Sequence, residues 1–152
     1  MKAKDKTISV DLYASWARYR ADLLRIDARC FGHRGSDEDG FEREVKDAMF
    51  VAVIREGDRG FGYCLVKRQW PKTAEIACTG IEPDYQNKGH LATLIGAVED
   101  ELRHCRYEFI ERHCRTAEGY ADQVERHYGE RVLVKYDHES AIDPLRFFRI
   151  RL

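Results

Sequence analysis

The sequence lacks a large net charge, a long apolar run and any paired-cysteine motif, and each absence excludes a class of protein. Its 26 basic residues are balanced by 27 acidic ones, so no overall positive field favours nucleic acid or an anionic membrane as a partner. The longest purely apolar run, residues 48–54, is far shorter than the roughly 18–20 residues of a transmembrane helix. The five cysteines include no CxxC pair, which favours reduced thiols over a disulfide framework. Because the first residues also lack the apolar stretch of a secretory signal, we expect a cytoplasmic protein.

Nothing in the sequence divides the chain into parts. The 152 residues contain no low-complexity tract, no linker rich in proline, glycine or serine, and no repeat with a period of roughly 20–50 residues. Hydrophobic residues make up 43%, and a chain of this length buries roughly 68–70% of its unfolded surface without a disulfide or a metal. We therefore expect one domain over residues 1–152.

The pattern of apolar residues predicts both helices and strands. In some segments apolar side chains recur every three or four positions, as on one face of an amphipathic helix. These segments are 12–31, 41–48, 89–104 and 117–127. Runs rich in β-branched and aromatic residues predict strands at 49–55, 61–70, 73–81, 107–115, 132–138 and 145–152. The strand–helix–strand passage within a largely antiparallel set implies a mixed α/β sheet with helices on both faces.

The most informative stretch, residues 81–91, joins a predicted strand to a predicted helix. A strand that feeds a tight turn into a helix leaves several backbone N–H groups unpaired, and the helix dipole adds positive potential there. Such a corner suits phosphate oxygens, and Gly89 lets a ligand approach the backbone with no Cβ in the way. From the residues alone, this segment is either an anion site or a capped helix start after a turn.

Within this turn, Gln86 and Gly89 follow the sequence Ile-x-Pro-x-Tyr. The pattern resembles the signature turn of the GNAT acyltransferase superfamily, Gln/Arg-x-x-Gly-x-Gly/Ala, and the order of elements over residues 12–136 is also similar. The resemblance implies a GNAT-like, mostly antiparallel twisted sheet, and an acyl-CoA donor, usually acetyl-CoA. It places the pyrophosphate on the turn and pantetheine beside the preceding strand. The implied cofactor-binding residues are Ile81, Gln86, Asn87, Lys88, Gly89, His90, Leu91 and Ala92.

Two residues depart from the family pattern. Leu91 stands at the last motif position, where the family has glycine or alanine. A leucine there either crowds the cofactor or points into the core, and we favour the core because Leu91 begins the apolar stripe of the helix. Ala121 stands where the family commonly has an asparagine, which leaves one pantetheine contact unaccounted for.

The resemblance also implies direct transfer of an acyl group to an amine, which needs a base for the amine and an acid for the leaving thiolate. An alkylammonium with a pKa near ~10.4 is almost fully protonated at neutral pH. By resemblance, Glu75 in the run Ala-Glu-Ile is the candidate base, with a solvent-facing strand glutamate as the alternative. Tyr128 is the candidate acid, with a packing tyrosine at a helix end as the alternative. Glu82, on the turn itself, is expected to be solvated.

Other functions remain as alternatives. A catalytically inactive GNAT-shaped module that binds acyl-CoA or regulates a partner is consistent with the two departures. A toxin that acylates aminoacyl-tRNA is disfavoured by the near-neutral charge. Cys78 is either a reactive thiol or inert core. The pairs His104–Cys105 and His113–Cys114 lack the spacing of a zinc site, so we expect no metal. The acceptor is expected to be a small-molecule or peptide amine, and a homodimer would be common for the family.

Overall fold

The computed structural model describes residues 5–32, 37–69, 71–140 and 143–152. Trp70, at the end of a predicted strand, lies outside the described residues. The helices are α1 (Trp16–Phe31), α2 (Glu38–Asp47), α3 (His90–His104) and α4 (Tyr120–Tyr128), with short 3-10 turns η2 (Pro83–Tyr85), η3 (Ala117–Gly119) and η4 (Gly129–Arg131). The strands are β1 (Ile8–Asp11), β2 (Phe50–Glu56), β3 (Arg59–Gln69), β4 (Thr73–Ile81), β5 (Phe109–Arg115), β6 (Val132–Glu139) and β7 (Pro144–Arg151).

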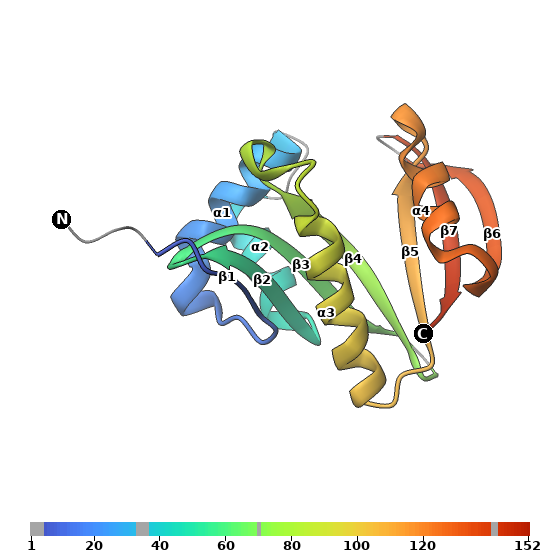
Figure 1. Ribbon diagram of the computed structural model, residues 1–152, viewed down its shortest axis with the longest axis horizontal. Helices are drawn as coiled ribbons and strands as arrows, with labels where there is room; N and C mark the ends of the chain where they lie inside the picture. The colour runs from blue at the N-terminus through green and yellow to red at the C-terminus, as the bar shows by residue number, and fades with distance from the viewer. Residues whose placement is uncertain (1–4, 33–36, 70, 141–142) are drawn as a thin grey trace.

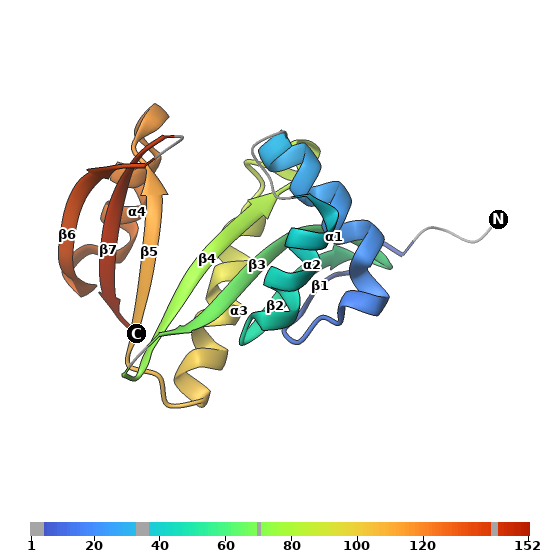
Figure 2. The ribbon, with the colours of Figure 1, turned by 180° about the vertical axis from the view of Figure 1, so that it is seen from behind.

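The described residues form a seven-stranded sheet in the order β1-β2-β3-β4-β5-β7-β6. Neighbouring strands run antiparallel except β4 and β5, which are parallel. Helices α3 and α4 lie on one face of the sheet, and α1 and α2 lie on the other (Figures 1 and 2). This mixed, mostly antiparallel sheet with helices on both faces confirms the predicted fold class. No helix within the described ranges is both long and apolar enough to cross a membrane.

The first helix begins later than its apolar spacing predicts, and an unpredicted strand precedes it. Ser15 Oγ accepts a hydrogen bond of 3.2 Å from the backbone N–H of Arg18 and so caps α1, which begins at Trp16. The residues before this cap, Ile8–Asp11, pair with β2 as β1. Its four residues, Ile-Ser-Val-Asp, alternate apolar and polar, but the run is short and none of them is buried.

Apolar residues pack on both faces of the central strands. On the α3 face, Leu94, Val98 and Leu102 are fully buried in a cluster that includes β4 residues. On the α1 face, Leu23 and Ile26 are fully buried in a second cluster. Strand β4 is thereby held from both sides, which fixes the position of the turn that follows it.

Strands β4 and β5 pair over only part of their length. Their register runs from Thr73 opposite Phe109 to Ile76 opposite Arg112. Beyond that point β4 continues to Ile81 without pairing to β5, and the two strands diverge (Figures 1 and 2). The divergence coincides with an irregularity in the pairing of β3 with β4, where the register passes from Ile76 to Cys78 and skips one residue. Such a bulge bends a strand, and here it bends β4 away from β5.

Candidate active site

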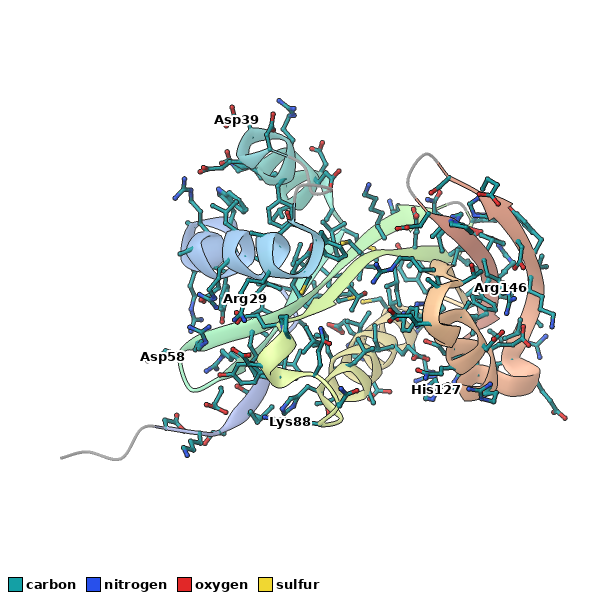
Figure 3. All side chains as sticks on the ribbon, turned by 90° about the horizontal axis from the view of Figure 1, so that it is seen from above. Arg29, Asp39, Asp58, Lys88, His127 and Arg146 are labelled. Carbon is teal, nitrogen blue, oxygen red and sulfur yellow. The ribbon has the colours of Figure 1, made fainter. Side chains whose placement is uncertain are left out.

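A cleft of about 1240 Å³ lies where β4 and β5 separate. Its walls come from β4 and β5, from the turn before α3, and from α1, α3 and α4. Viewed from above, Lys88 marks the turn before α3 and His127 marks α4 on the same face of the sheet (Figure 3). The unpaired stretch of β4 that follows Ile76 therefore forms an open edge inside a cleft, with backbone groups available to a ligand.

The turn after β4 leaves a row of backbone amides free at the start of α3. Asn87 and Gly89 adopt left-handed backbone, with φ of 62° and 83°, and Gly89 is the N-cap of α3 without a side-chain cap. Within the described ranges, the N–H groups from Asn87 to Ala92 meet no acceptor, whereas the Thr93 N–H bonds to the Gly89 carbonyl at 3.2 Å. A Cβ added at Gly89 would meet nothing within 4 Å. This corner therefore offers several donors and the positive end of a helix dipole to an anion.

The side chains of the turn mostly hold its shape. Gln86 Nε2 donates a 2.9 Å hydrogen bond to the carbonyl of Ile81, which ties the turn back to the end of β4. The Tyr85 ring stacks on Phe61 with centroids 4.1 Å apart, and the His90 ring meets Phe61 at 4.8 Å. Lys88 is exposed and does not line the cleft, and its Nζ lies 5.9 Å from the centroid of the Tyr85 ring. The aromatic stack explains why the turn keeps a defined shape.

Leu91 and Ala121, the two departures from the family pattern, both contact the core. Leu91 is half-buried, packs against the apolar cluster under α3, and also lines the cleft. Ala121 is 1% exposed and belongs to the same cluster. The structure therefore places part of Leu91 in the core, as its position in the apolar stripe predicts.

Glu82 is buried, and the expectation that it is solvated is wrong. Its carboxylate is 0% exposed and accepts from Arg25 Nε at 2.7 Å, Arg29 Nη1 at 2.8 Å and Arg59 Nη2 at 3.1 Å. Burial raises the pKa of Glu82, but the hydrogen bond and charge of Arg25 and the charge of Arg59 outweigh it and hold the pKa below its ordinary value. Three arginines thus fix the first residue of the turn to α1 and β3.

Glu75 lies on the part of β4 that still pairs with β5, opposite Glu111. It is half-buried, lines the cleft, and its Oε2 accepts a 2.7 Å hydrogen bond from Gln69 Nε2. In the antiparallel pairing with β3 it stands opposite Lys67. The side chain therefore faces the cleft, but from its closed end.

Tyr128 is 3% exposed and belongs to a buried polar network at the floor of the cleft. Its hydroxyl donates to Glu99 Oε2 at 3.2 Å and accepts from Arg112 Nη1 at 3.3 Å. Burial raises the pKa of Tyr128 to about 12, with Glu99 adding to the shift and Arg112 opposing it. Glu99 also accepts from Arg131 at 2.7 Å, so its own charge is compensated.

Arg112 and Tyr120 are site residues that sequence reasoning missed. Arg112 is 6% exposed, lines the cleft and donates from Nη2 to the Tyr120 hydroxyl at 3.1 Å. No carboxylate within the described residues lies at ion-pair distance from it. A buried guanidinium without a counter-ion is costly, so its charge is available to an anionic group in the cleft. Alternation along β5 gave the only available signal, since it places Arg112 on the same face as the apolar Ile110 and Cys114.

The cysteine and metal alternatives find little support in the geometry. Burial raises the pKa of the Cys78 thiol to about 12, so it is protonated at neutral pH and is a poor nucleophile. Across the part of the chain that the structure describes, no three or more His, Cys, Asp or Glu side chains are grouped to hold a metal ion. His104 and Cys105 are exposed at the end of α3, away from His113 and Cys114 on β5.

Comparison with known proteins gives both a family and a fold. A model of the acetyltransferase (GNAT) family matches residues 19–129. The ribosomal-protein-S18-alanine N-acetyltransferase from Escherichia coli has 12% identity and a TM-score of 0.78, over 95% of this chain and 94% of that one. An N-acetyltransferase from Staphylococcus aureus has 14% identity and a TM-score of 0.73, over 95% of this chain and 98% of that one. A GNAT family acetyltransferase from Elizabethkingia anophelis with acetyl-CoA bound has 14% identity and a TM-score of 0.69, over 98% and 100%. No curated protein sequence matches.

Proposed function

Because the chain belongs to the acetyltransferase (GNAT) family, we propose that it is an acetyl-CoA-dependent N-acyltransferase that moves an acyl group directly from the thioester to an amine. The observation that carries the proposal is the row of free amides from Asn87 to Ala92, which opens on the cleft between β4 and β5. Acetyl-CoA supplies the activated acyl group. The chain's own residues would bind it, exclude water and move two protons.

The cleft is suited to a long ligand that is anionic at one end. The amides at the start of α3, together with the helix dipole, would hold a pyrophosphate. The unpaired edge of β4 after Ile76 offers backbone donors and acceptors to the amides of pantetheine, as an open strand edge does to any extended chain. Gln86, Gly89 and Leu91 line the same cleft and would contact the ligand along this path.

The two proton transfers need groups on the cleft wall. For removal of the amine proton, Glu75 is the proposal that follows from the sequence. For protonation of the thiolate we propose Tyr128, with the Tyr120 hydroxyl as the neighbouring alternative, since both phenols accept a hydrogen bond from Arg112. The uncompensated charge of Arg112 favours negative charge that develops on the sulfur beside it.

Binding and turnover of acetyl-CoA test this function. A ligand at 100 times its Kd adds about 2.7 kcal/mol to the free energy of unfolding, so a clear thermal shift is expected at sub-millimolar acetyl-CoA. Free CoA thiol should then appear with at least one acceptor from a panel of amines. The panel should contain a peptide with N-terminal alanine, free lysine and an aliphatic diamine. Absence of any shift with a series of acyl-CoAs would remove the proposal.

A second candidate is an inactive module that binds acyl-CoA without transfer. Leu91 and Ala121 favour it, because each replaces a residue type that the family pattern carries at the cofactor. A thermal shift with acetyl-CoA, but no thiol release with any amine, would identify this module. For either function we propose a single cytoplasmic domain over residues 1–152, which acts without a membrane or nucleic acid.

A further inference from the structure

Two histidines from different strands touch at the edge of the cleft. Nδ1 of His113 on β5 lies 3.0 Å from Nε2 of His138 on β6, and the rings meet edge to face with centroids 5.1 Å apart. Phe147, on the strand between them, packs against the His113 ring at 5.2 Å. His113 is exposed and lines the cleft, and its Nε2 has no hydrogen-bond partner in the described part of the chain. Nδ1 of His113 is thus held by His138, whereas Nε2 is available to a ligand in the cleft.

Strand alternation places His113 on the face opposite the proposed cofactor. Its neighbours Arg112 and Cys114 point toward α4, because Arg112 bonds to Tyr128 and Cys114 shares the core cluster of Tyr128. His113 therefore points to the face that α1 and α2 cover. The free amides of α3 lie on the first face, so a cofactor bound there would leave the second face to the amine. His113 lines the cleft and points to that second face.

His113 is also better placed along the strand than Glu75. Glu75 stands where β4 and β5 are still hydrogen-bonded, and Gln69 holds one of its oxygens. His113 follows Arg112, the last β5 residue paired with β4, so it stands where the strands have begun to separate. A base must come within hydrogen-bond reach of the proton that it removes, which favours the group beside the opening over the group at its closed end.

We propose that His113 is a catalytic residue that removes the amine proton, and that His138 is a positioning residue that fixes its ring. The proposal rests on the acyl-transfer function above. An N–H bond of the ammonium breaks and its proton goes to Nε2 of neutral His113. The freed lone pair on nitrogen forms the C–N bond as the C–S bond breaks, and the sulfur leaves with its electron pair. The sulfur takes a proton from a phenol, and the second proton lost by the nitrogen restores that phenol. His113 then releases its proton to water.

The surroundings of His113 suit this role. From β6 it faces the His138 imidazole, and from β7 it faces the apolar ring of Phe147. On its own strand, the nearest charged side chains on the same face are Glu111 and Arg115. Oε1 of Glu111 lies 3.9 Å from Nη1 of Arg149. Imidazoles as a class change charge between pH 5 and 8, the range in which a base for neutral-pH catalysis must work. The hydrogen bond to His138 fixes the orientation of the ring.

The test compares His113→Asn with His104→Asn, using acetyl-CoA and an amine that the wild-type protein acetylates. Asparagine at position 113 can keep the contact that Nδ1 makes but cannot accept a proton, whereas His104 is exposed at the end of α3, outside the cleft. We expect His113→Asn to lower kcat/KM by about 100-fold or more and to remove the acidic limb of the pH–rate profile. His104→Asn should leave both unchanged. His138→Asn should move the acidic limb to a different pH with a smaller loss of rate.

Two further measurements separate a catalytic role from a structural one. Added imidazole should restore activity to His113→Ala, and the Kd of acetyl-CoA should stay within about twofold in all variants, because the cofactor site is on the other face. The proposal is overturned if His113→Asn keeps the wild-type profile, or if Glu75→Gln removes the acidic limb instead. A wild-type protein that binds acetyl-CoA but acetylates no amine would refute the function itself, which is a different result.

Discussion

Tyr128 donates a 3.2 Å hydrogen bond to the carboxylate of Glu99, so a single buried phenol joins α4 to α3 under the floor of the cleft. Arg112 approaches the same hydroxyl at 3.3 Å from β5. The contact therefore serves two purposes at once: it connects the two diverging halves of the sheet, and it holds a proton beside an uncompensated positive charge.

The first prediction concerns this phenol. Tyr128→Phe should lower kcat by about 100-fold, with little change in the KM for acetyl-CoA, if its proton reaches the thiolate. The free energy of unfolding should also fall by about 1–3 kcal/mol, because Glu99 loses a buried donor. Steady-state kinetics and urea unfolding measure the two effects. Tyr120→Phe is the matched control, and a larger loss of kcat in that variant would reassign the acid to Tyr120.

The second prediction concerns the buried carboxylate of the turn. Glu82→Gln should lower the free energy of unfolding by about 2–4 kcal/mol, since removing one member of a buried ion pair leaves charge uncompensated. The effect is expected in the lower part of the range because Arg25, Arg29 and Arg59 all reach solvent. Asp84→Asn is the control, because its side chain is 73% exposed, and it should change stability by less than about 0.5 kcal/mol. If Asp84→Asn lost as much free energy of unfolding as Glu82→Gln does, the burial of the Glu82 ion pairs would not explain the loss.

The third prediction is that the free energy of unfolding depends on pH in the acidic range. The pKa of Glu82 is lower in the folded protein than its ordinary value, so the carboxylate contributes stability above its unfolded pKa, which is near ~4.3. That contribution is lost as the pH falls through the folded pKa. The wild-type protein should therefore lose more free energy of unfolding between neutral pH and about pH 3 than Glu82→Gln does. Parallel curves for the two proteins, measured by urea unfolding at each pH, would show that the pKa is not lowered.

The fourth prediction separates backbone strain from ligand contact at the start of α3. Gly89 and Gly119 both have positive φ, 83° and 74°, both are helix N-caps, and a Cβ at either would meet nothing within 4 Å. Alanine at each position should cost about 1–2 kcal/mol of stability from strain alone. Only Gly89→Ala should also weaken acetyl-CoA binding, by about tenfold, because its Cβ stands where the pyrophosphate would approach. Isothermal titration measures the affinity of each variant for acetyl-CoA. If Gly89→Ala binds acetyl-CoA as tightly as Gly119→Ala does, the ligand lies elsewhere.

The fifth prediction concerns the residue that departs from the family motif. Leu91→Ala should lower the free energy of unfolding by about 1–3 kcal/mol, less than a fully buried leucine, because Leu91 is half-buried against the core. The Kd of acetyl-CoA should change by less than about threefold if the side chain serves the core. A tenfold tighter Kd would instead show that the leucine crowds the ligand.

Periodic patterns determined most of the fold from the sequence alone. The stripe that begins at Leu91 and continues through Leu94 and Val98 predicted α3, because one face of a helix must be apolar to cover a sheet. The pattern around Gln86 and Gly89 predicted the turn before it, and the structure has a turn there, whereas its binding role stays a prediction. The short strand β1 escaped detection, because none of its residues is buried and pairing with β2 is what defines it.

Tertiary structure alone decided which distant side chains share a site. Glu82 is bound by arginines 23 to 57 positions away, so its burial depends on how α1 and β3 dock around the turn. His113 and His138 are 25 positions apart and meet because β7 inserts between β5 and β6 in the sheet. The spacing of apolar residues within a short segment predicts which face of that helix or strand is buried, but not which distant segment packs against it. The order of strands in a sheet is set by the packing of the whole chain, and so are the contacts that depend on it.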